Sequence, residues 1–191
     1  MKEIIFVTSN TGKVKTLERK LNTTKYRVTR KNIELPEIQA DNSREISIFK
    51  ARAAYDMLRR PVIVQDSSFH IAALGGFPGP YIKYVNETIG AEGILRLLQN
   101  VSDRSAHFEL ALTYKDKNIE RTFVNVAKAG RIAETLYEAN SENAWSSLWK
   151  VYIPPGQTEP LAALPSESLK KRDQGNSDNS EFAQFIRWLD K

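Results

Sequence analysis

Hydrophobic and polar positions near the start of the chain switch between two periodicities. Residues 3–8 (EIIFVT) form a short apolar, partly β-branched run, which is typical of a buried strand. The polar residues 9–12 then predict a turn. From Lys13 onward, apolar residues recur three or four positions apart, which predicts a helix with the inward positions Val14, Leu17 and Leu21. The 8–13 loop is therefore expected at a strand-to-helix junction.

Two more short strands are predicted before the middle of the chain. Residues 26–29 predict the first of them, and residues 33–41 predict a loop because Pro36 lacks the N–H that a sheet interior requires. Residues 61–64 predict the second strand, which would deliver residues 65–68 at its carboxyl end.

A helix is predicted between the 33–41 loop and Pro61. Asn42 and Glu45 have the spacing of a capping box at its start. Its apolar face is expected to consist of four residues at helical spacing, namely Ile46, Phe49, Ala53 and Met57.

The second half of the pattern begins with loop chemistry. Residues 74–81 (LGGFPGPY) contain three glycines and two prolines, which predicts a loop with unusual backbone angles. Residues 89–98 predict a helix. Residues 106–114 and 119–132 alternate loosely around a turn at 115–118, which predicts an antiparallel pair. Helices in the first half of the chain and antiparallel strands in the second half together predict a mixed α/β sheet.

The last part of the chain gives weaker signals. Residues 149–153 predict a strand, and residues 174–180 (QGNSDNS) predict a polar loop. The chain is expected to continue into an amphipathic helix packed by Trp188, with the apolar positions Phe182, Phe185, Ile186 and Leu189.

Composition places the chain among globular proteins. Its 191 residues are 41% hydrophobic and 27% charged, which predicts a single domain over residues 1–191. The chain contains no cysteine, which excludes disulfides, thiolate metal sites and cysteine nucleophiles. The apolar run in residues 1–7 is too short for a signal peptide or a membrane span, so a cytoplasmic location is expected.

The net charge of +5 favours anionic partners, either nucleic acid or a pocketed phosphate. Basic residues are dispersed among acidic ones, and the runs 27–31 and 170–172 are short. Most of these basic residues are expected to lie on the solvated surface. Nucleic-acid binding is therefore the weaker interpretation.

The 8–13 loop is the first candidate for phosphate binding. At a strand-to-helix junction, backbone N–H groups, the positive end of the helix dipole and a lysine can converge on phosphate oxygens. The candidate residues are Thr8, Ser9, Asn10, Thr11, Gly12 and Lys13. The alternative is an ordinary turn in which Asn10 caps the helix.

Acidic residues supply the second candidate. Asp66, at the end of the predicted strand, can hold magnesium or accept a proton from water, and Glu37 can add a second oxygen ligand. The alternatives are a turn cap for Asp66 and simple solvation for Glu37. Lys50 lies at the edge of its helix face and can reach a phosphate or merely cover the core. His70 and His107 are far apart in sequence, and each is expected to be structural.

Several motifs, in order and spacing, resemble the archaeal branch of the inosine triphosphate pyrophosphatase family. The segment that follows Asp66 is the most specific of them. The motifs are TSNTGK at 8–13, PEIQAD at 36–41, EISIFKA at 45–51, QDSSFHIAALGGFPGPY at 65–81 and DRSAHF at 103–108. The likeness extends over about the first two thirds of the chain.

The resemblance implies a fold and an activity. The fold is an elongated mixed α/β sheet with two lobes around a central cleft, usually paired as a homodimer. Members hydrolyse non-standard purine nucleoside triphosphates to monophosphate and pyrophosphate with magnesium, which cleans the nucleotide pool.

Residue roles follow from the resemblance by position. It implies that Asp66 is both magnesium ligand and proton acceptor, and that Glu37 is the second metal ligand. The implied substrate contacts are Thr8, Asn10, Lys13, Lys50 and Ser67.

The chain departs from the family pattern toward its end. Residues 145–150 read WSSLWK where the family has Gly-Phe-Gly-Tyr-Asp-Pro, and residues 177–179 read Ser-Asp-Asn where it has Ser-His-Arg. Gln65 replaces an acidic residue, and either Lys170 or Lys171 matches a family lysine. The alternative function is therefore an impaired member that binds a nucleotide or a partner subunit without turnover.

Overall fold

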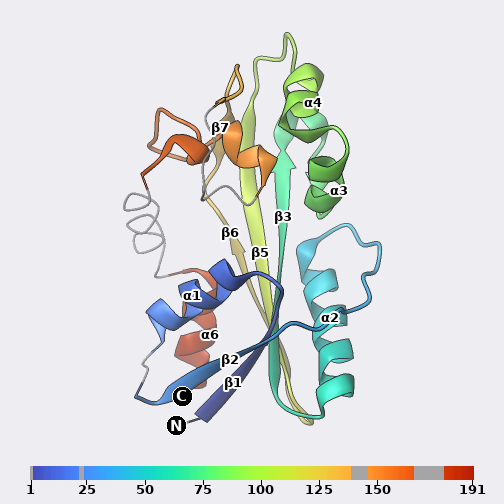
Figure 1. Ribbon diagram of the computed structural model, residues 1–191, viewed down its shortest axis with the longest axis vertical. Helices are drawn as coiled ribbons and strands as arrows, with labels where there is room; N and C mark the ends of the chain where they lie inside the picture. The colour runs from blue at the N-terminus through green and yellow to red at the C-terminus, as the bar shows by residue number, and fades with distance from the viewer. Residues whose placement is uncertain (1, 22–23, 139–145, 166–178) are drawn as a thin grey trace. The chain divides into compact units, whose positions relative to one another are not determined.

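The computed structural model describes residues 2–21, 24–138, 146–165 and 179–191, and they form two compact units (Figure 1). Unit 1 contains residues 1–67, 110–125 and 176–191, and unit 2 contains residues 68–109 and 126–175. The strands form one mixed sheet in the order β2-β1-β3-β5-β7-β8, with β4 on β3 and β6 on β5. The expected mixed α/β sheet is confirmed.

Parallel strands form the sheet of unit 1. Strand β1 (Lys2–Val7) pairs with β2 (Tyr26–Lys31) along its whole length, from Lys2↔Tyr26 to Val7↔Lys31. On its other side, β1 pairs with β3 (Val62–Ile71) at Ile5↔Val62 and Phe6↔Ile63. The two strands expected at 3–8 and 26–29 are confirmed, and β2 is two residues longer than expected.

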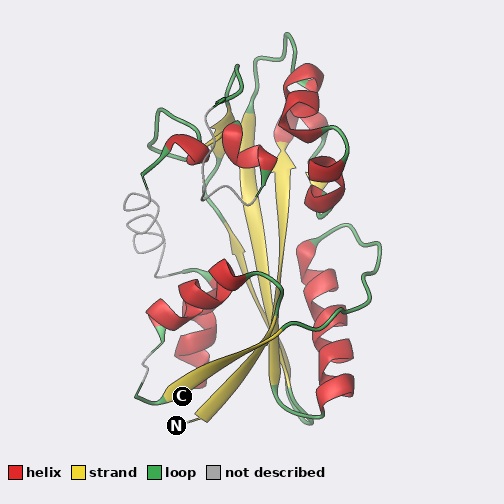
Figure 2. Cartoon of the chain, viewed as in Figure 1, coloured by secondary structure: helices red, strands yellow, loops and turns green. Residues whose placement is uncertain are grey.

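Alternating side chains give this sheet two apolar faces, which different helices cover (Figure 2). Helices α1 (Thr11–Lys20) and α6 (Glu181–Leu189) pack against one face, which includes Ile4, Phe6 and Ile63. Helix α2 (Ser43–Leu58) packs against the other face, which consists of Ile5, Val7, Val62 and Val64. Consecutive residues of β1 and β3 therefore belong to different cores, as the period of two requires.

The expected apolar face of α2 is correct at Ile46 and wrong at Met57, while Phe49 and Ala53 are only half-buried. Its buried residues are Ser43, Ile46, Ser47, Ala51 and Ala54, whereas Met57 is 60% exposed. Small side chains let the helix lie close to the sheet, and the Ser47 hydroxyl hydrogen-bonds Thr113 at 2.7 Å. The helical period of α2 was predicted correctly. Its contact with the sheet, however, uses small residues, which a search for large apolar side chains misses.

Strand β3 does not end before Asp66. It runs on to Ile71, so Asp66 and Ser67 lie inside the strand rather than at its carboxyl end. Its pairing with β1 ends at Ile63, and β1 itself ends at Val7. Asp66 therefore lies on the part of β3 that runs past the end of β1, where the 8–13 loop replaces β1.

In unit 2, the 74–81 segment is more regular than expected. It includes the end of a 3₁₀ turn (Ala72–Leu74) and a two-residue strand, β4 (Pro78–Gly79), which pairs antiparallel with β3. Gly75, Gly76 and Gly79 have positive φ angles, as the glycine content predicts. The chain continues through α3 (Ile82–Glu87), which the pattern did not predict, and α4 (Gly90–Leu97), which it did.

The long segment predicted at 119–132 is two strands. After the turn that follows β5 (Ser105–Lys115), β6 (Glu120–Val126) pairs with β5 and then ends. Strand β7 (Gly130–Ile132) pairs antiparallel with β5 and with β8 (Tyr152–Ile153). A Cβ on Gly130 would lie 2.2 Å from the Ile153 carbonyl oxygen, so this pairing requires glycine.

Two further expectations fall near the end of the chain. The strand expected at 149–153 begins only at Tyr152, because Ser147–Lys150 forms a 3₁₀ turn. The amphipathic helix is confirmed as α6, and Trp188 packs against Tyr114, Phe123 and Phe185. A further 3₁₀ turn spans Leu161–Ala163.

Some expected features lie outside the described residues. These are Trp145, Lys170, Lys171 and residues 174–178 of the expected polar loop. Within the part of the chain that is described, no helix has the length and apolar character needed to cross a membrane.

The aromatic cluster of α6 leads to a stability prediction. Phe185 is fully buried against Phe123, Tyr114 and Trp188, so Phe185→Ala should lower the free energy of unfolding by about 3–5 kcal/mol. The exposed Met57→Ala should change it by less than about 0.5 kcal/mol. Urea denaturation followed by tryptophan fluorescence measures both. An equally large loss for Met57→Ala would contradict the assigned face of α2.

Candidate active site

One ammonium group joins the two acidic residues of the candidate site. Lys50 Nζ donates to Glu37 Oε1 at 2.7 Å and to Asp66 Oδ1 at 3.1 Å. The side chains of Lys50 and Asp66 are largely buried, whereas that of Glu37 is 53% exposed. The structure thus brings together all three residues that the sequence singled out from separate segments.

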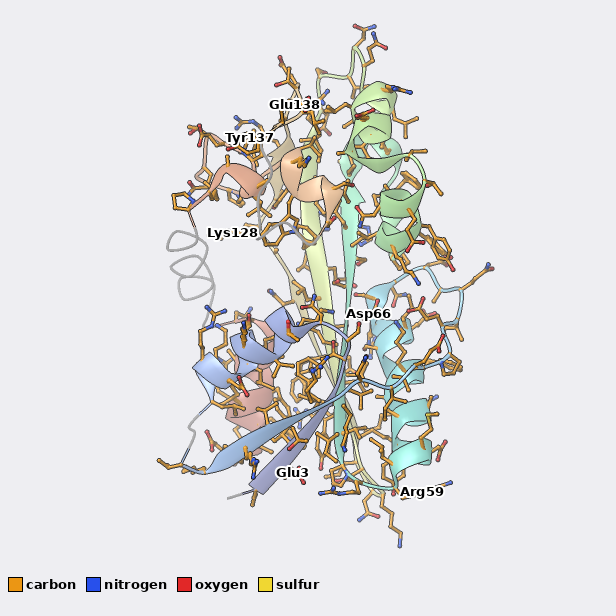
Figure 3. All side chains as sticks on the ribbon, in the orientation of Figure 1. Glu3, Arg59, Asp66, Lys128, Tyr137 and Glu138 are labelled. Atoms are coloured by element: carbon orange, nitrogen blue, oxygen red, sulfur yellow. The ribbon has the colours of Figure 1, made fainter. Side chains whose placement is uncertain are left out.

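The fold of unit 1 explains why these side chains meet. By the alternation along β3, Asp66 projects from the same face as Val64, which is the face covered by α2. Lys50 lies on α2, and Glu37 lies in the loop that leads into α2. Figure 3 shows Asp66 on β3 between the first turns of α1 and α2.

The surroundings of Lys50 keep it charged. Burial opposes the charged ammonium, but the carboxylates of Asp66 and Glu37 outweigh that effect and raise the pKa of Lys50 above its ordinary value. An ammonium that is held in this way offsets the repulsion between two nearby carboxylates.

The 8–13 loop is braced internally. The Asn10 side chain accepts hydrogen bonds from the N–H groups of Gly12 at 2.8 Å and Lys13 at 3.3 Å, and Asn10 N donates to Thr8 Oγ1 at 3.1 Å. Asn10 is therefore the N-cap of α1, as one of the two readings expected. Four of the N–H groups proposed for phosphate binding, those of Thr8, Asn10, Gly12 and Lys13, already have an acceptor.

Lys13 brings a second ammonium to the site. Its Nζ donates to the Gln65 carbonyl oxygen at 3.1 Å, one residue before Asp66. Burial lowers the pKa of Lys13, and the charge of Lys50 adds to that effect, while the charges of Asp66 and Glu181 oppose it. The chain therefore places Lys13 and Lys50 within electrostatic reach of the same carboxylate.

Sequence reasoning missed two contributors, Glu181 and Arg30, and the contact that Gln65 makes. The Gln65 side chain projects to the opposite face from Asp66, where its amide donates to the carboxylate of Glu181 in α6. Arg30 Nη1 donates to the Ser9 carbonyl oxygen at 3.2 Å. The position of Arg30 could have been predicted from a β2 that pairs with β1 along its whole length. The burial of Glu181 could not, because an acid in the first turn of a helix is usually exposed.

The remaining candidates lie elsewhere. Ser67 follows Asp66 on β3 but, by alternation, projects to the opposite face. His70 and His107, both in unit 2, were each expected to be structural, and their rings stack with centroids 5.2 Å apart. His70 Nε2 also lies 2.9 Å from the Ser68 hydroxyl. Neighbouring strands bring the two histidines together, which their separation in sequence conceals.

The donor set fits a hard divalent cation. Magnesium is commonly held by one or two carboxylates, with the remaining positions filled by water and substrate phosphates. Glu37 and Asp66 supply two carboxylates that approach one point, now marked by the Lys50 ammonium. Among the described residues, no group of three or more His, Cys, Asp or Glu side chains could hold a metal ion by itself.

Fold and site together define an α/β protein in which a sheet carboxylate, Asp66, and a loop carboxylate, Glu37, lie beside lysine side chains. The chain belongs to the Ham1 family, whose model matches residues 4–174. The resemblance drawn from the motifs is thereby confirmed.

Relatives and solved structures agree with this assignment. Proteins named dITP/XTP pyrophosphatase from Saccharolobus solfataricus and Methanopyrus kandleri are 39% and 34% identical to the chain. The matches cover 81% and 97% of this chain and 76% and 96% of those proteins. The structure of the Staphylococcus aureus Ham1 protein aligns with a TM-score of 0.74 at 25% identity, covering 98% of this chain and 96% of that one.

A HAM1 protein from Coxiella burnetii has the same fold. Its structure aligns with a TM-score of 0.75 at 21% identity, covering 99% of this chain and 96% of that one.

The pairing of Lys50 gives a prediction about stability. Lys50→Met leaves Glu37 and Asp66 facing each other without a cation, so it should lower the free energy of unfolding by about 1–3 kcal/mol at pH 7 in a buffer free of divalent ions. Because the folded-state pKa of Lys50 is raised, its contribution is complete below pH 10.5 and is lost as the pH rises through the folded value. Thermal denaturation across that pH range measures it.

The control is on the same helix. Arg52 pairs with Glu120 but is 60% exposed, so Arg52→Met should cost less than about 1 kcal/mol. Equal losses of unfolding free energy in Lys50→Met and Arg52→Met would mean that the Lys50 pairing stabilises the fold no more than an exposed ion pair does.

Proposed function

We propose that this chain is a magnesium-dependent nucleoside triphosphate pyrophosphatase that acts on non-standard purine nucleotides. It would convert the triphosphate to monophosphate and pyrophosphate and so clean the nucleotide pool. The names of the relatives, dITP/XTP pyrophosphatase, support both the substrate class and the reaction.

The observation that carries the proposal is the meeting of Glu37, Lys50 and Asp66. Lys50 Nζ lies 2.7 Å from one carboxylate and 3.1 Å from the other, and Lys13 is bonded to the residue before Asp66. A triphosphate needs positive charge along its oxygens, and its hydrolysis needs a carboxylate beside the reacting phosphorus. This cluster offers both.

Magnesium, when bound, would be held by Glu37 and Asp66 and would offset negative charge on the phosphates. The same two carboxylates now share the Lys50 ammonium. Lys50 would then be free to turn toward a phosphate oxygen, so the charge of the site stays balanced in both states.

Asp66 is the group best placed to accept a proton. A water molecule beside its carboxylate would attack the α-phosphorus and give its proton to Asp66. The bond from the α-phosphorus to the bridging oxygen would break, and pyrophosphate would leave with that oxygen. Lys13, and Lys50 once released, would stabilise the charge on the leaving group.

The 8–13 loop supports this reaction chiefly by position. The positive end of the α1 dipole would favour phosphate oxygens at this loop, and Asn10 caps the first turn of α1. Because Asn10 occupies two N–H groups, the lysine ammonium groups are the main phosphate donors in this proposal. The homodimer and the cytoplasmic location expected from the sequence stay predictions.

The proposal predicts pyrophosphate release from dITP or XTP in the presence of magnesium. Asp66→Asn should lower kcat by about 10²- to 10⁴-fold, because the variant cannot accept the proton. Removing divalent ions with a chelator should abolish turnover. Asp56→Asn, an exposed aspartate of α2, is the matched control and should behave as the wild type.

A second outcome would reverse the conclusion. Binding of triphosphates without any release of pyrophosphate, across a panel of standard and non-standard bases, would point instead to the impaired family member that binds without turnover.

A further inference from the structure

Glu181 is a buried acid that the proposed mechanism does not use. It is the first residue of α6 and only 3% exposed, and its carboxylate accepts a hydrogen bond from the Gln65 amide. Gln65 is 6% exposed, and its own Oε1 has no hydrogen-bond partner among the described residues. The backbone N–H of Glu181 also donates to its carboxylate. A buried carboxylate nevertheless stays costly unless a cation offsets its charge.

Lys13 supplies a cation on the same face of the sheet. Lys13 Nζ is bonded to the backbone oxygen of Gln65, the residue whose side chain holds Glu181. Burial raises the pKa of Glu181, while its own backbone N–H, the Gln65 amide and the charges of Lys13 and Lys20 oppose that rise. Conversely, the charges of Glu181 and Asp66 support the charged form of Lys13. Gln65 thus links the two groups on the α1 and α6 face of the sheet.

We propose that Glu181 is a positioning residue of the site, which balances the charge of Lys13 through the buried Gln65 link and keeps the Lys13 ammonium available to phosphate. This inference rests on the proposed function, because it gives Lys13 its role there. It adds a residue from α6 that neither the motifs nor the relatives assign.

The fold alone does not require an acid at this position. The packing of α6 comes from Phe182 and Phe185, and its N-cap bond comes from the Ser180 hydroxyl, which accepts from Ala183 N at 3.2 Å. Replacing a buried charge by a neutral group of the same size is often neutral or stabilising. An acid in the first turn also suits the helix dipole, but its burial against Gln65 additionally brings its charge to act on Lys13.

The test measures the affinity of the full chain for magnesium tripolyphosphate by calorimetry, which requires no turnover. Glu181→Gln keeps the size and the hydrogen-bond acceptor but removes the charge, and it should weaken binding about tenfold. The double variant Gln65→Glu with Glu181→Gln moves the carboxylate to the other end of the same hydrogen bond, and it should restore binding to within about threefold.

A pH profile separates this role from a structural one. The charged groups that act on Lys13 are Asp66 on β3, Lys50 on α2 and Glu181 on α6. Without Glu181, Lys13 should lose its proton at lower pH, so the alkaline limit of binding should move to lower pH. Glu18→Gln, an exposed charge change on α1, should shift neither the affinity nor this limit.

Each remaining outcome is decisive. Wild-type affinity in Glu181→Gln, together with weakened binding in Lys13→Ala, would overturn the positioning role alone. If Glu181→Gln does not fold, the double variant decides, and failure of that variant to bind overturns the inference. Tripolyphosphate binding with the expected pattern but without pyrophosphate release would overturn the proposed function and leave this inference standing. Absence of tripolyphosphate binding in the wild type would overturn both.

Discussion

The arrangement of unit 1 around Asp66 depends on one ammonium group placed between two carboxylates. Without Lys50, Glu37 and Asp66 would face each other in a partly buried setting where repulsion is weakly screened. The pairing also fixes the loop before α2, because Glu37 belongs to that loop and Lys50 to the helix. A single contact therefore joins a loop, a helix and a strand at the point where chemistry is expected.

The alternation of side chains along β3 decides which helix each residue near Asp66 meets. Gln65 and Asp66 are neighbours in sequence, yet one meets α6 and the other meets α2. Because β1 ends at Val7, the loop that replaces it brings Lys13 back to the Gln65 carbonyl. Both faces of the sheet thus contribute charged groups to one region, and the strand between them sets their spacing.

Local pattern was sufficient for most elements of unit 1, including β1, α1 and the α6 helix, because each has a clear apolar period. It failed where packing overrides composition. Helix α2 meets the sheet through Ala51 and Ala54, and β3 continues past Asp66 through Ser67 and Ser68 to the buried Phe69 and Ile71. The site residues were found through motifs, whereas Glu181 was not, since burial of an acid follows from tertiary contacts alone.

Unit 1 is assembled from three separated stretches of the chain, and α6 supplies the last of them. Phe182 and Phe185 cover Phe6, Leu17 and Ile63, which belong to the first third of the sequence. During synthesis on the ribosome, these early residues stay without their apolar cover until residues 181–189 have emerged. The core on this face of β1 and β3 is therefore completed only after α6 has been made, more than a hundred residues after both strands.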